Sequence, residues 1–322
     1  MKILITGGAG YVGSHVARVF LKDGHQVSIY DNLSSGYREA LPSGCSFLFG
    51  DVRDTDQLRF ILNKDKVDGV IHCAGKLSVP ESLSAPLDYY DHNVSGTIAL
   101  GKACQATNVS KIIFSSTAFV YQGDNSSLDE TSLADPQTPY GQSKLMAEKI
   151  LQDFEAAGRA RILSLRYLNV AGASEENGQR TPDATHLIKV CAEAACGKRP
   201  FVEIFGTNYS TPDGTCVRDY IHVEDLAQLH VHAFQALENG LPGQVLNCGY
   251  GQGFSVREVI QTMQKVSGVN FEVRSAPRRP GDLPHLVANT SRARELLRWS
   301  PAHPDLSAIC HSAYVWEQKL QR

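Results

Sequence analysis

The chain has 322 residues, of which 42% are hydrophobic and 20% are charged, and its formal net charge is −3. This is the composition of an ordinary globular protein, and the lack of a basic bias argues against a nucleic-acid or membrane-surface partner. We find no apolar stretch that could span a bilayer and no signal peptide before the first predicted strand, so we expect a cytoplasmic protein. The eight cysteines form neither a C-x-x-C pair nor a cluster with histidines. We therefore expect free thiols, without disulfides or a metal site.

A glycine-rich turn follows the first predicted strand, residues 2–6. Gly7, Gly10 and Gly13 give the spacing G-x-x-G-x-x-G and lead into a predicted helix at residues 11–23. Such glycines permit a tight turn and a close approach of the backbone to a pyrophosphate, and the helix N-terminus offers N–H groups to the phosphates. We therefore expect this turn, with Tyr11 and Val12 at the helix start, to bind a dinucleotide.

An acidic residue follows the second predicted strand, residues 26–30. Asp31 lies roughly 20 residues after the last glycine of the turn, where such folds bind the ribose hydroxyls of the adenosine. A carboxylate repels a 2′-phosphate and no arginine follows at once, so NAD is favoured over NADP.

Strands and helices alternate through the first half of the chain, which predicts a parallel sheet with helices on both faces. Further strands are predicted at 46–49, 67–73, 111–115 and 161–167, and further helices at 54–63, 89–107 and 140–157. Ligands bind at the carboxyl ends of strands in open α/β sheets, so the residues after the third and fourth strands are expected to contact the cofactor. These are Asp51 and Val52 near the adenine, and Cys73, Ala74 and Gly75 near the ribose and pyrophosphate. For Asp51, a turn or helix-capping carboxylate is the alternative.

The pattern changes after residue 170. Residues 172–185 are polar and glycine-rich, which predicts a loop that carries substrate contacts. Shorter strands are then predicted at 217–221, 244–248 and 271–274, and helices at 223–238, 255–267, 291–298 and 305–319. The fold class is therefore α/β, with a doubly wound parallel-sheet Rossmann domain and a smaller α/β substrate domain. The Rossmann domain is predicted from 1–170 plus about 213–240, and the substrate domain from about 171–212 and 241–322.

Three side chains are expected to carry the chemistry. Tyr140 and Lys144 lie four residues apart, on one face of the helix predicted at 140–157. A tyrosine has an ordinary pKa of about 10, so proton transfer near pH 7 requires a nearby cation that lowers it. Thr117 follows the fifth strand and faces the same crevice. Over a nicotinamide, the tyrosinate removes a proton from a hydroxyl group, Thr117 shares the hydrogen bonds, and Lys144 holds the ribose.

Motifs along nearly the whole chain resemble the extended short-chain dehydrogenase/reductase family and, within it, the UDP-glucose 4-epimerase family. They occupy residues 6–15, 31–33, 50–52, 74–75, 79–82, 89–90, 140–144, 166–173, 213–223 and 278–282. The run D-G-T-C-V-R-D-Y-I-H-V at 213–223 is highly specific to these epimerases, whereas the opening glycines are not.

The resemblance implies a reversible interconversion of UDP-galactose and UDP-glucose with tightly held NAD, and a homodimer. Tyr140 takes the proton of the sugar 4-hydroxyl while hydride leaves carbon 4, the 4-keto sugar turns over, and hydride returns to its other face.

The resemblance also implies further contacts. Arg218 and Arg279 suit the diphosphate, because guanidinium groups bind phosphate oxygens bidentately. A structural pair with Asp219 or Asp225 is the alternative for Arg218, and an ordinary helix start is the alternative for His186. The remaining implied contacts are Asn32 and Leu168 to the cofactor, Asn169, His186 and Asp282 to the UDP-sugar, and Phe205 to the uracil. Lys76 is displaced from the family's usual lysine position, so no cofactor contact is assigned to it, and a contact between His92 and the cofactor stays open.

Leu286 occupies the position that, in the family, gates the size of the sugar. A tyrosine there excludes N-acetylated sugars and a small residue admits them, so UDP-N-acetylglucosamine and UDP-xylose stay open as substrates. A sugar-nucleotide 4,6-dehydratase shares the fold but carries an Asp-Glu pair after the threonine, where this chain has Ala118 and Phe119. A non-catalytic NAD-sensing regulator is the other alternative, and the presence of Tyr140 and Lys144 argues against it.

Overall fold

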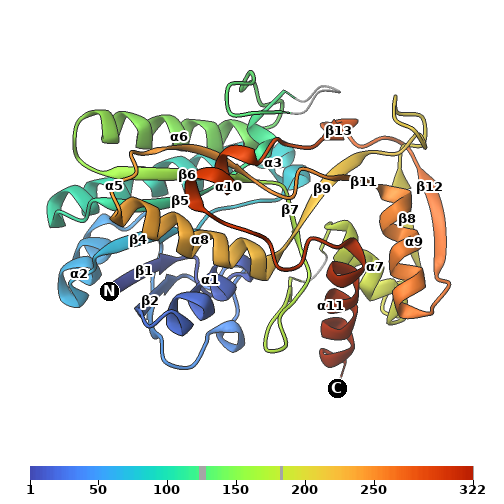
Figure 1. The fold of residues 1–322 in the computed structure, drawn as a ribbon, viewed down its shortest axis with the longest axis horizontal. Helices are drawn as coiled ribbons and strands as arrows, with labels where there is room; N and C mark the ends of the chain where they lie inside the picture. Colours follow the sequence, from blue (N-terminus) through green and yellow to red (C-terminus); the bar gives the residue numbers. More distant parts are fainter. Residues whose placement is uncertain (123–127, 182–183, 322) are drawn as a thin grey trace.

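A parallel sheet forms the centre of the larger part of the molecule (Figure 1). The computed structural model describes residues 1–122, 128–181 and 184–321, and within these residues seven strands form the sheet in the order β10-β6-β5-β4-β1-β2-β3. Its strands are β1 (Lys2–Thr6), β2 (Gln26–Asp31), β3 (Ser46–Phe49), β4 (Gly69–His72), β5 (Lys111–Thr117), β6 (Arg161–Tyr167) and β10 (Gln244–Cys248). The chain runs outward from β1 to β3 and then returns to β4 on the other side of β1, which creates a switch point between β1 and β4. The predicted doubly wound α/β fold is confirmed.

Helices cover both faces of this sheet. On one face lie α1 (Tyr11–Lys22) and α8 (Val223–Glu238), and on the other α2 (Thr55–Asp65), α5 (Gly96–Thr107) and α6 (Pro139–Ala156). Neighbouring strand residues point to opposite faces, so Ile3 and Ile5 join the core around α1 while Leu4 joins the core around α5. Burial on both faces explains why these strands are continuous apolar runs in the sequence.

The smaller part of the molecule is built from two short sheets and three helices. In the described residues, β7 (Asn169–Ala171), β9 (Val217–His222), β11 (Gly253–Ser255) and β13 (His285–Leu286) form one sheet, and β8 (Phe201–Phe205) pairs with β12 (Glu272–Ala276). The helices α7 (Leu187–Ala195), α9 (Val256–Ser267) and α11 (Leu306–Lys319) pack against one another. A further helix, α10 (Ser291–Leu297), packs on α8 and β10 of the larger part.

Two strands lie on the other side of the predicted domain boundary. β9 was expected in the Rossmann domain but pairs with β7, β11 and β13. β10 was expected in the substrate domain but pairs with β6 as the edge strand of the large sheet. The reason is that pairing depends on which strand edges the fold leaves open, and not on proximity in the sequence. The division into a cofactor domain and a substrate domain stays a proposal, with these two strands exchanged.

The helix predicted at 89–107 contains three elements. It begins with α4 (Pro86–Tyr89), continues as the π-helix η2 (Tyr90–Ser95), and ends as α5. The short elements α3 (Val79–Ser84), α7, β7, β8, β11 and β13 and the 3-10 turns η1 (Arg38–Ala40) and η3 (Ala118–Val120) were not predicted from the sequence. Residues 182 and 183 of the predicted loop lie outside the described residues.

The eight cysteines all lie in the described ranges and are free thiols. None of the helices in these ranges combines the length and the apolar character needed to cross a membrane.

Candidate functional site

The glycine turn between β1 and α1 is packed so tightly that side chains would not fit. Gly7 has a φ of +71°, and a Cβ atom there would lie 2.6 Å from the backbone nitrogen of Ala74. A Cβ atom at Gly13 would lie 2.3 Å from the carbonyl oxygen of Gly7. Among the described residues no side chain caps α1, and its first turn carries no acidic residue, so its first N–H groups remain available to an anion. The turn therefore fits a pyrophosphate.

Asp31 lies at the carboxyl end of β2, next to this turn. Its two carboxylate oxygens accept hydrogen bonds from the backbone N–H groups of Ala9, at 3.0 Å, and Leu33, at 2.7 Å. Burial raises the pKa of Asp31, and these two hydrogen bonds oppose that effect. Each oxygen retains lone pairs, as a contact with ribose hydroxyls requires.

Asp51 is occupied by protein partners. Its carboxylate accepts hydrogen bonds from the Arg53 guanidinium, at 2.8 Å, and from Asn32 Nδ2, at 3.0 Å. The bonds from Arg53 hold the pKa of Asp51 well below its usual range. The Asp51 carboxylate also accepts the Arg53 backbone N–H at 3.0 Å, as the turn interpretation predicted. Val52, the second residue predicted near the adenine, is buried and packs against Gly96.

The segment after β4 contacts α6, the helix that carries Tyr140 and Lys144. A Cβ atom at Gly75 would lie 2.8 Å from Asn93 Oδ1 and 3.4 Å from Lys144 Nζ. Asn93, in the π-helix η2, accepts the Lys76 N–H at 2.8 Å and donates to Ser143 Oγ at 2.9 Å. Sequence reasoning missed Asn93, because it lies among other polar residues in η2 and has no distinctive local signal.

The helix α6 brings Tyr140 and Lys144 to the end of β5. It begins at Thr138, whose side chain accepts the Gly141 N–H at 3.3 Å, and continues through Pro139 in the first turn. Both predicted side chains are buried. The Tyr140 ring packs between those of Tyr89 and Phe119, with both centroid distances at 6.3 Å.

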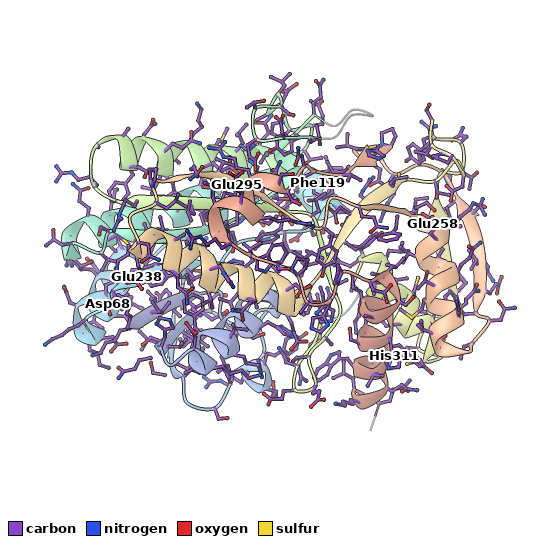
Figure 2. All side chains as sticks on the ribbon, in the orientation of Figure 1. Asp68, Phe119, Glu238, Glu258, Glu295 and His311 are labelled. Atoms are coloured by element: carbon purple, nitrogen blue, oxygen red, sulfur yellow. The ribbon has the colours of Figure 1, made fainter. Side chains whose placement is uncertain are left out.

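Lys144 Nζ donates a hydrogen bond of 2.8 Å to the carbonyl oxygen of Ser115 and lies 4.8 Å from the centre of the Phe114 ring. Phe119 lies near the border between the two parts of the molecule (Figure 2).

The pKa values at this site differ from the sequence expectation. Burial raises the pKa of Tyr140, and a hydrogen bond with Thr117 lowers it. The sequence predicted that Lys144 lowers the pKa of Tyr140, but burial and Thr117 are the influences on that pKa in the structure. The Lys144 ammonium donates its hydrogen bond to the Ser115 carbonyl. Burial also lowers the pKa of Lys144 to about 8, and the charges of Cys73 and Glu148 oppose that effect.

Glu148 is a buried carboxylate one helical turn after Lys144 that sequence reasoning missed. It forms an ion pair of 2.5 Å with Arg166 of β6 and accepts a hydrogen bond from Ser116. The Arg166 guanidinium in turn lies 4.8 Å from the centre of the Tyr121 ring. In the sequence, Glu148 resembles any charged residue of a solvent-exposed helix face.

Four residues predicted to hold the UDP group converge in the smaller part. Asp282 lies between two arginines, 3.1 Å from Arg279 Nε and 3.9 Å from the nearest nitrogen of Arg218. The Arg279 guanidinium lies 4.3 Å from the centre of the Phe205 ring. The predicted alternative for Arg218 is wrong, because its ion-pair partner is Asp282 and neither Asp219 nor Asp225.

The loop that carries Arg279 reaches the start of α6, whereas Arg218 lies on β9. A Cβ atom at Gly281 would lie 3.1 Å from Thr138 Cγ2, the residue before the first turn that holds Tyr140. Leu286 is fully buried and joins a core cluster with Ala118 and Leu168. The predicted diphosphate site, the size gate and the Tyr140 site are therefore neighbours.

The other residues considered for cofactor or substrate contacts lie close to protein groups. Asn169 Nδ2 lies 3.5 Å from the Asp219 carbonyl oxygen. His186 is the residue before α7, as the helix-start interpretation predicted; it lies 3.1 Å from Gln179 Nε2, and burial lowers its pKa. Lys76 pairs with Glu81 at 2.8 Å, and the His92 ring contacts the Asp88 carbonyl at 2.8 Å.

Comparison with known proteins finds a matching family, similar sequences and similar structures. The sequence profile of the NAD dependent epimerase/dehydratase family matches residues 3–249. The UDP-glucose 4-epimerase of Azospirillum brasilense is 47% identical, over 100% of this chain and 93% of its own length.

Two solved structures are similar over nearly their whole length. A UDP-glucose 4-epimerase from Stenotrophomonas maltophila, with bound NAD and formylated UDP-arabinopyranose, is 38% identical and superposes with a TM-score of 0.96, covering 100% of this chain and 99% of its own. The UDP-Glc/GlcNAc 4-epimerase of Campylobacter jejuni is 45% identical with a TM-score of 0.86, covering 99% of both chains.

Proposed function

Because the chain belongs to the NAD dependent epimerase/dehydratase family, we propose that it is an NAD-dependent UDP-sugar 4-epimerase that interconverts UDP-galactose and UDP-glucose. The observation that carries this proposal is that two groups of side chains meet near the carboxyl end of β5 in the large sheet. Tyr140, Lys144 and Thr117 form the proton-transfer group. Arg218 and Arg279 form the group for the diphosphate, and the loop that carries Arg279 contacts the start of α6.

The reaction starts with proton removal from the sugar 4-hydroxyl by Tyr140. Burial holds the free phenol in its protonated form, so the reaction needs positive charge close to the ring. When bound, NAD supplies a hydride acceptor for carbon 4 and a positively charged nicotinamide. Thr117 shares its hydrogen bond with the tyrosine and the sugar hydroxyl, while the Lys144 ammonium binds the ribose and adds a second positive charge.

The 4-keto sugar must then present its other face, which requires a firm hold on the UDP group and a loose hold on the hexose. Arg218 and Arg279 hold the diphosphate by charge-assisted hydrogen bonds, and Phe205 offers an aromatic face to the uracil. Gly7 and Gly13 let the turn approach the cofactor pyrophosphate, and the Asp31 carboxylate accepts hydrogen bonds from the ribose hydroxyls. Tyr140 returns its proton once the keto group is reduced.

The alternatives are less well supported. A 4,6-dehydratase needs an acid and a base beside the threonine, and η3 places Ala118 and Phe119 there. A second substrate class is favoured by one observation: Leu286 is smaller than a tyrosine, and the similar Campylobacter jejuni enzyme is named for both glucose and N-acetylglucosamine forms. We therefore also propose activity on UDP-N-acetylglucosamine, at a lower rate.

A single assay tests the main proposal. Purified protein is incubated with UDP-galactose, with and without added NAD, and UDP-glucose is measured. If the protein retains its cofactor during purification, we expect conversion without added NAD. With added NAD we expect conversion whether or not the cofactor was retained. An absence of UDP-glucose under both conditions would contradict the function.

The family resemblance implies a homodimer, and exposed apolar side chains on α3, α4 and α6 support it. Leu87 of α4 is 78% exposed, and Leu83 of α3 and Met146 of α6 are about half exposed at 46% and 44%. These helices pack against one another. Light scattering tests the proposal: we expect a dimer for the natural chain and a monomer for Leu87→Glu.

We also propose a cytoplasmic location, where free thiols persist and UDP-sugars and NAD are available.

A further inference from the structure

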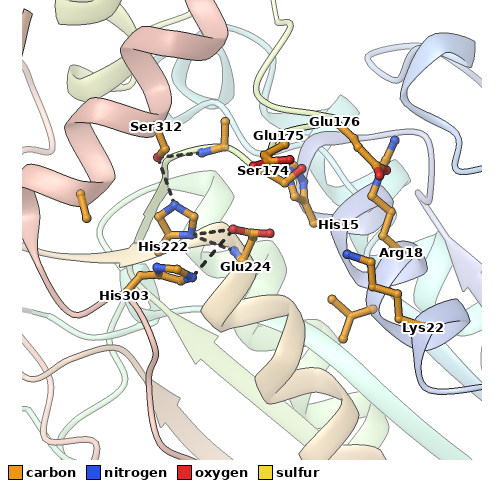
Figure 3. Close-up of a pocket in the computed structure, with 13 residues that line it drawn as sticks. His15, Arg18, Lys22, Ser174, Glu175, Glu176, His222, Glu224, His303 and Ser312 are labelled. Atoms are coloured by element: carbon orange, nitrogen blue, oxygen red, sulfur yellow. Dashed lines mark hydrogen bonds and ion pairs between the residues drawn. The ribbon is translucent and has the colours of Figure 1, made fainter.

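A pocket of about 370 Å³ lies beside α1, away from the residues assigned to the reaction (Figure 3). It is bordered by the end of β9, the start of α8 and the beginning of α11, and charged or polar residues make up most of its lining residues. Figure 3 shows the side chains of His222, Glu224 and His303 pointing toward one another at its wall. Nothing in the proposed epimerase chemistry uses these three residues.

The three side chains have the spacing of a metal site. Glu224 Oε2 lies 4.0 Å from His222 Nδ1 and 3.9 Å from His303 Nε2, and one ligand atom from each residue lies within 4.8 Å of the others. Bonds of about 2.1 Å in a tetrahedral site separate the ligand atoms by about 3.4 Å. Side-chain movements of roughly half an ångström to 1 Å therefore bring all three atoms to one ion.

The hydrogen bonds around His222 leave Nδ1 as the atom with a lone pair. Ser312 Oγ donates its own hydrogen to the Ile309 carbonyl at 3.0 Å, so toward His222 it acts as an acceptor. Nε2 must therefore carry the hydrogen of the ring, and Nδ1 is unprotonated. Nδ1 accepts the Glu224 backbone N–H at 3.2 Å, a long contact that an ion would replace. Metal-binding histidines usually donate their other ring N–H to such an acceptor, which fixes the tautomer.

The loop that carries His303 is held in place before any ion binds. The buried carboxylate of Asp225 accepts the backbone N–H groups of Ala302 and His303, both at 2.8 Å. Tyr250 donates to the same carboxylate at 2.5 Å and lies 3.0 Å from the carbonyl oxygen of His303. The third ligand is thus attached to a fixed backbone, which reduces the entropy cost of binding.

The charges of the pocket favour a cation. Glu175, Glu176 and Glu224 line it together with Arg18 and Lys22. Arg18 is paired with Glu176 at 3.4 Å. With neutral histidines, the lining carries one more negative than positive charge.

We propose that His222, Glu224 and His303 bind a divalent transition-metal ion of the zinc class, with water as the remaining ligand. Two imidazole nitrogens and one carboxylate suit zinc, whereas magnesium and calcium prefer oxygen ligands alone. The ion would connect the junction of β9 and α8 to the loop before α11. His222 also packs against Gly172, whose carbonyl oxygen accepts the Tyr11 hydroxyl at 2.7 Å. The ion would therefore stabilise the segment around Gly172, which contacts Tyr11 at the end of the glycine turn.

The test measures zinc directly. Full-length protein is stripped with a chelator, loaded with Zn²⁺, dialysed, and analysed for zinc per chain and for melting temperature. We expect one ion per chain and a higher melting temperature with zinc. His303→Ala and Glu224→Gln should each lower zinc affinity at least about tenfold and remove the stabilisation. Both should retain epimerase activity, so the result is independent of the proposed function.

The matched control is His311→Ala, at an exposed position of α11 outside the pocket lining. It should bind zinc as the natural chain does. The proposal is overturned if the natural chain retains no zinc, or if His303→Ala and Glu224→Gln retain as much as the control.

Discussion

Lys144 Nζ donates a 2.8 Å hydrogen bond to the carbonyl oxygen of Ser115, two residues before Thr117 on the same strand. This bond ties the catalytic helix α6 to the end of β5. It also places the ammonium beside the sheet edge, where a ribose is expected, and leaves the pKa of Tyr140 to be set by burial and by Thr117. In the proposed mechanism, the positive charge that the Tyr140 phenolate needs therefore comes with the bound cofactor.

The first prediction concerns the phenolic oxygen of Tyr140. Tyr140→Phe keeps the ring between Tyr89 and Phe119 and removes only the proton-transfer group. We expect turnover of UDP-galactose to fall by about 10²- to 10⁴-fold, while UDP binding measured by calorimetry stays within about twofold. Turnover close to that of the natural chain would remove Tyr140 from the mechanism.

The second prediction concerns the glycine turn. Gly7→Ala places a methyl group 2.6 Å from the Ala74 backbone and imposes a positive φ on a residue with a Cβ atom. We expect the variant to lose bound NAD, measured as cofactor released on denaturation. The control is Gly101→Ala in α5, where a Cβ atom meets nothing within 4 Å among the described residues. It should retain NAD and gain roughly 0.5 to 1 kcal/mol of stability. Equal NAD content in the two variants would argue against the turn as the cofactor site.

The third prediction separates diphosphate binding from chemistry. Arg218→Lys keeps the charge but loses the planar pair of donors that matches phosphate oxygens. Because the hexose is held elsewhere, we expect KM for UDP-galactose to rise by roughly tenfold, with a smaller change in kcat. Arg159→Lys, at an exposed position, should change neither. A fall in kcat alone would place Arg218 outside the ground-state contact with the diphosphate.

The fourth prediction concerns sugar size. Leu286 is fully buried in a cluster with Ala118 and Leu168, and we propose that its volume also limits the space for the sugar. Leu286→Tyr should lower the ratio of UDP-N-acetylglucosamine to UDP-glucose turnover, and Leu286→Ala should raise it. The alanine variant should also lose about 2 to 5 kcal/mol of stability, because it leaves a cavity. If the ratio is the same in both variants, Leu286 does not gate the sugar.

The sequence predicted the large sheet well because its strands are buried on both faces and its helices have strong amphipathic or capping signals. It also paired Tyr140 with Lys144, since helical spacing alone brings them to one face. Partners from different elements were harder to predict. Glu148 and Arg166 look like ordinary surface charges until α6 and β6 are packed together.

The contacts that the sequence could not predict depend on the topology of the fold. The meeting of Arg218, Arg279 and Phe205 was expected only from the family resemblance, because they come from β9, from the loop before β13 and from β8. The sequence predicted no metal site, because it has no C-x-x-C pair or cluster of cysteines and histidines. The proposed ligand His303 lies far along the chain from His222 and Glu224. The exchange of β9 and β10 between the two parts has the same origin: neighbours in the sequence need not be neighbours in a sheet.

The last prediction concerns acid stability and His230 of α8. The ring is fully buried, and burial lowers the pKa of His230 to about 4. The unfolded chain, with a histidine pKa of about 6.5, therefore binds this proton first as the pH falls, so stability is fully present above pH 6.5 and is lost toward pH 4. His230 should contribute about 1.4 kcal/mol of destabilisation per pH unit in that window.

His230→Leu removes this proton and also removes Nε2, which has no hydrogen-bond partner within the described residues. Urea unfolding at several pH values should show a shallower dependence between pH 6.5 and 4 for this variant, by about 1.4 kcal/mol per pH unit. His311→Leu, at an exposed position of α11, should leave the dependence as it is in the natural chain. An equal slope for His230→Leu and the natural chain would show that the buried imidazole does not drive acid unfolding.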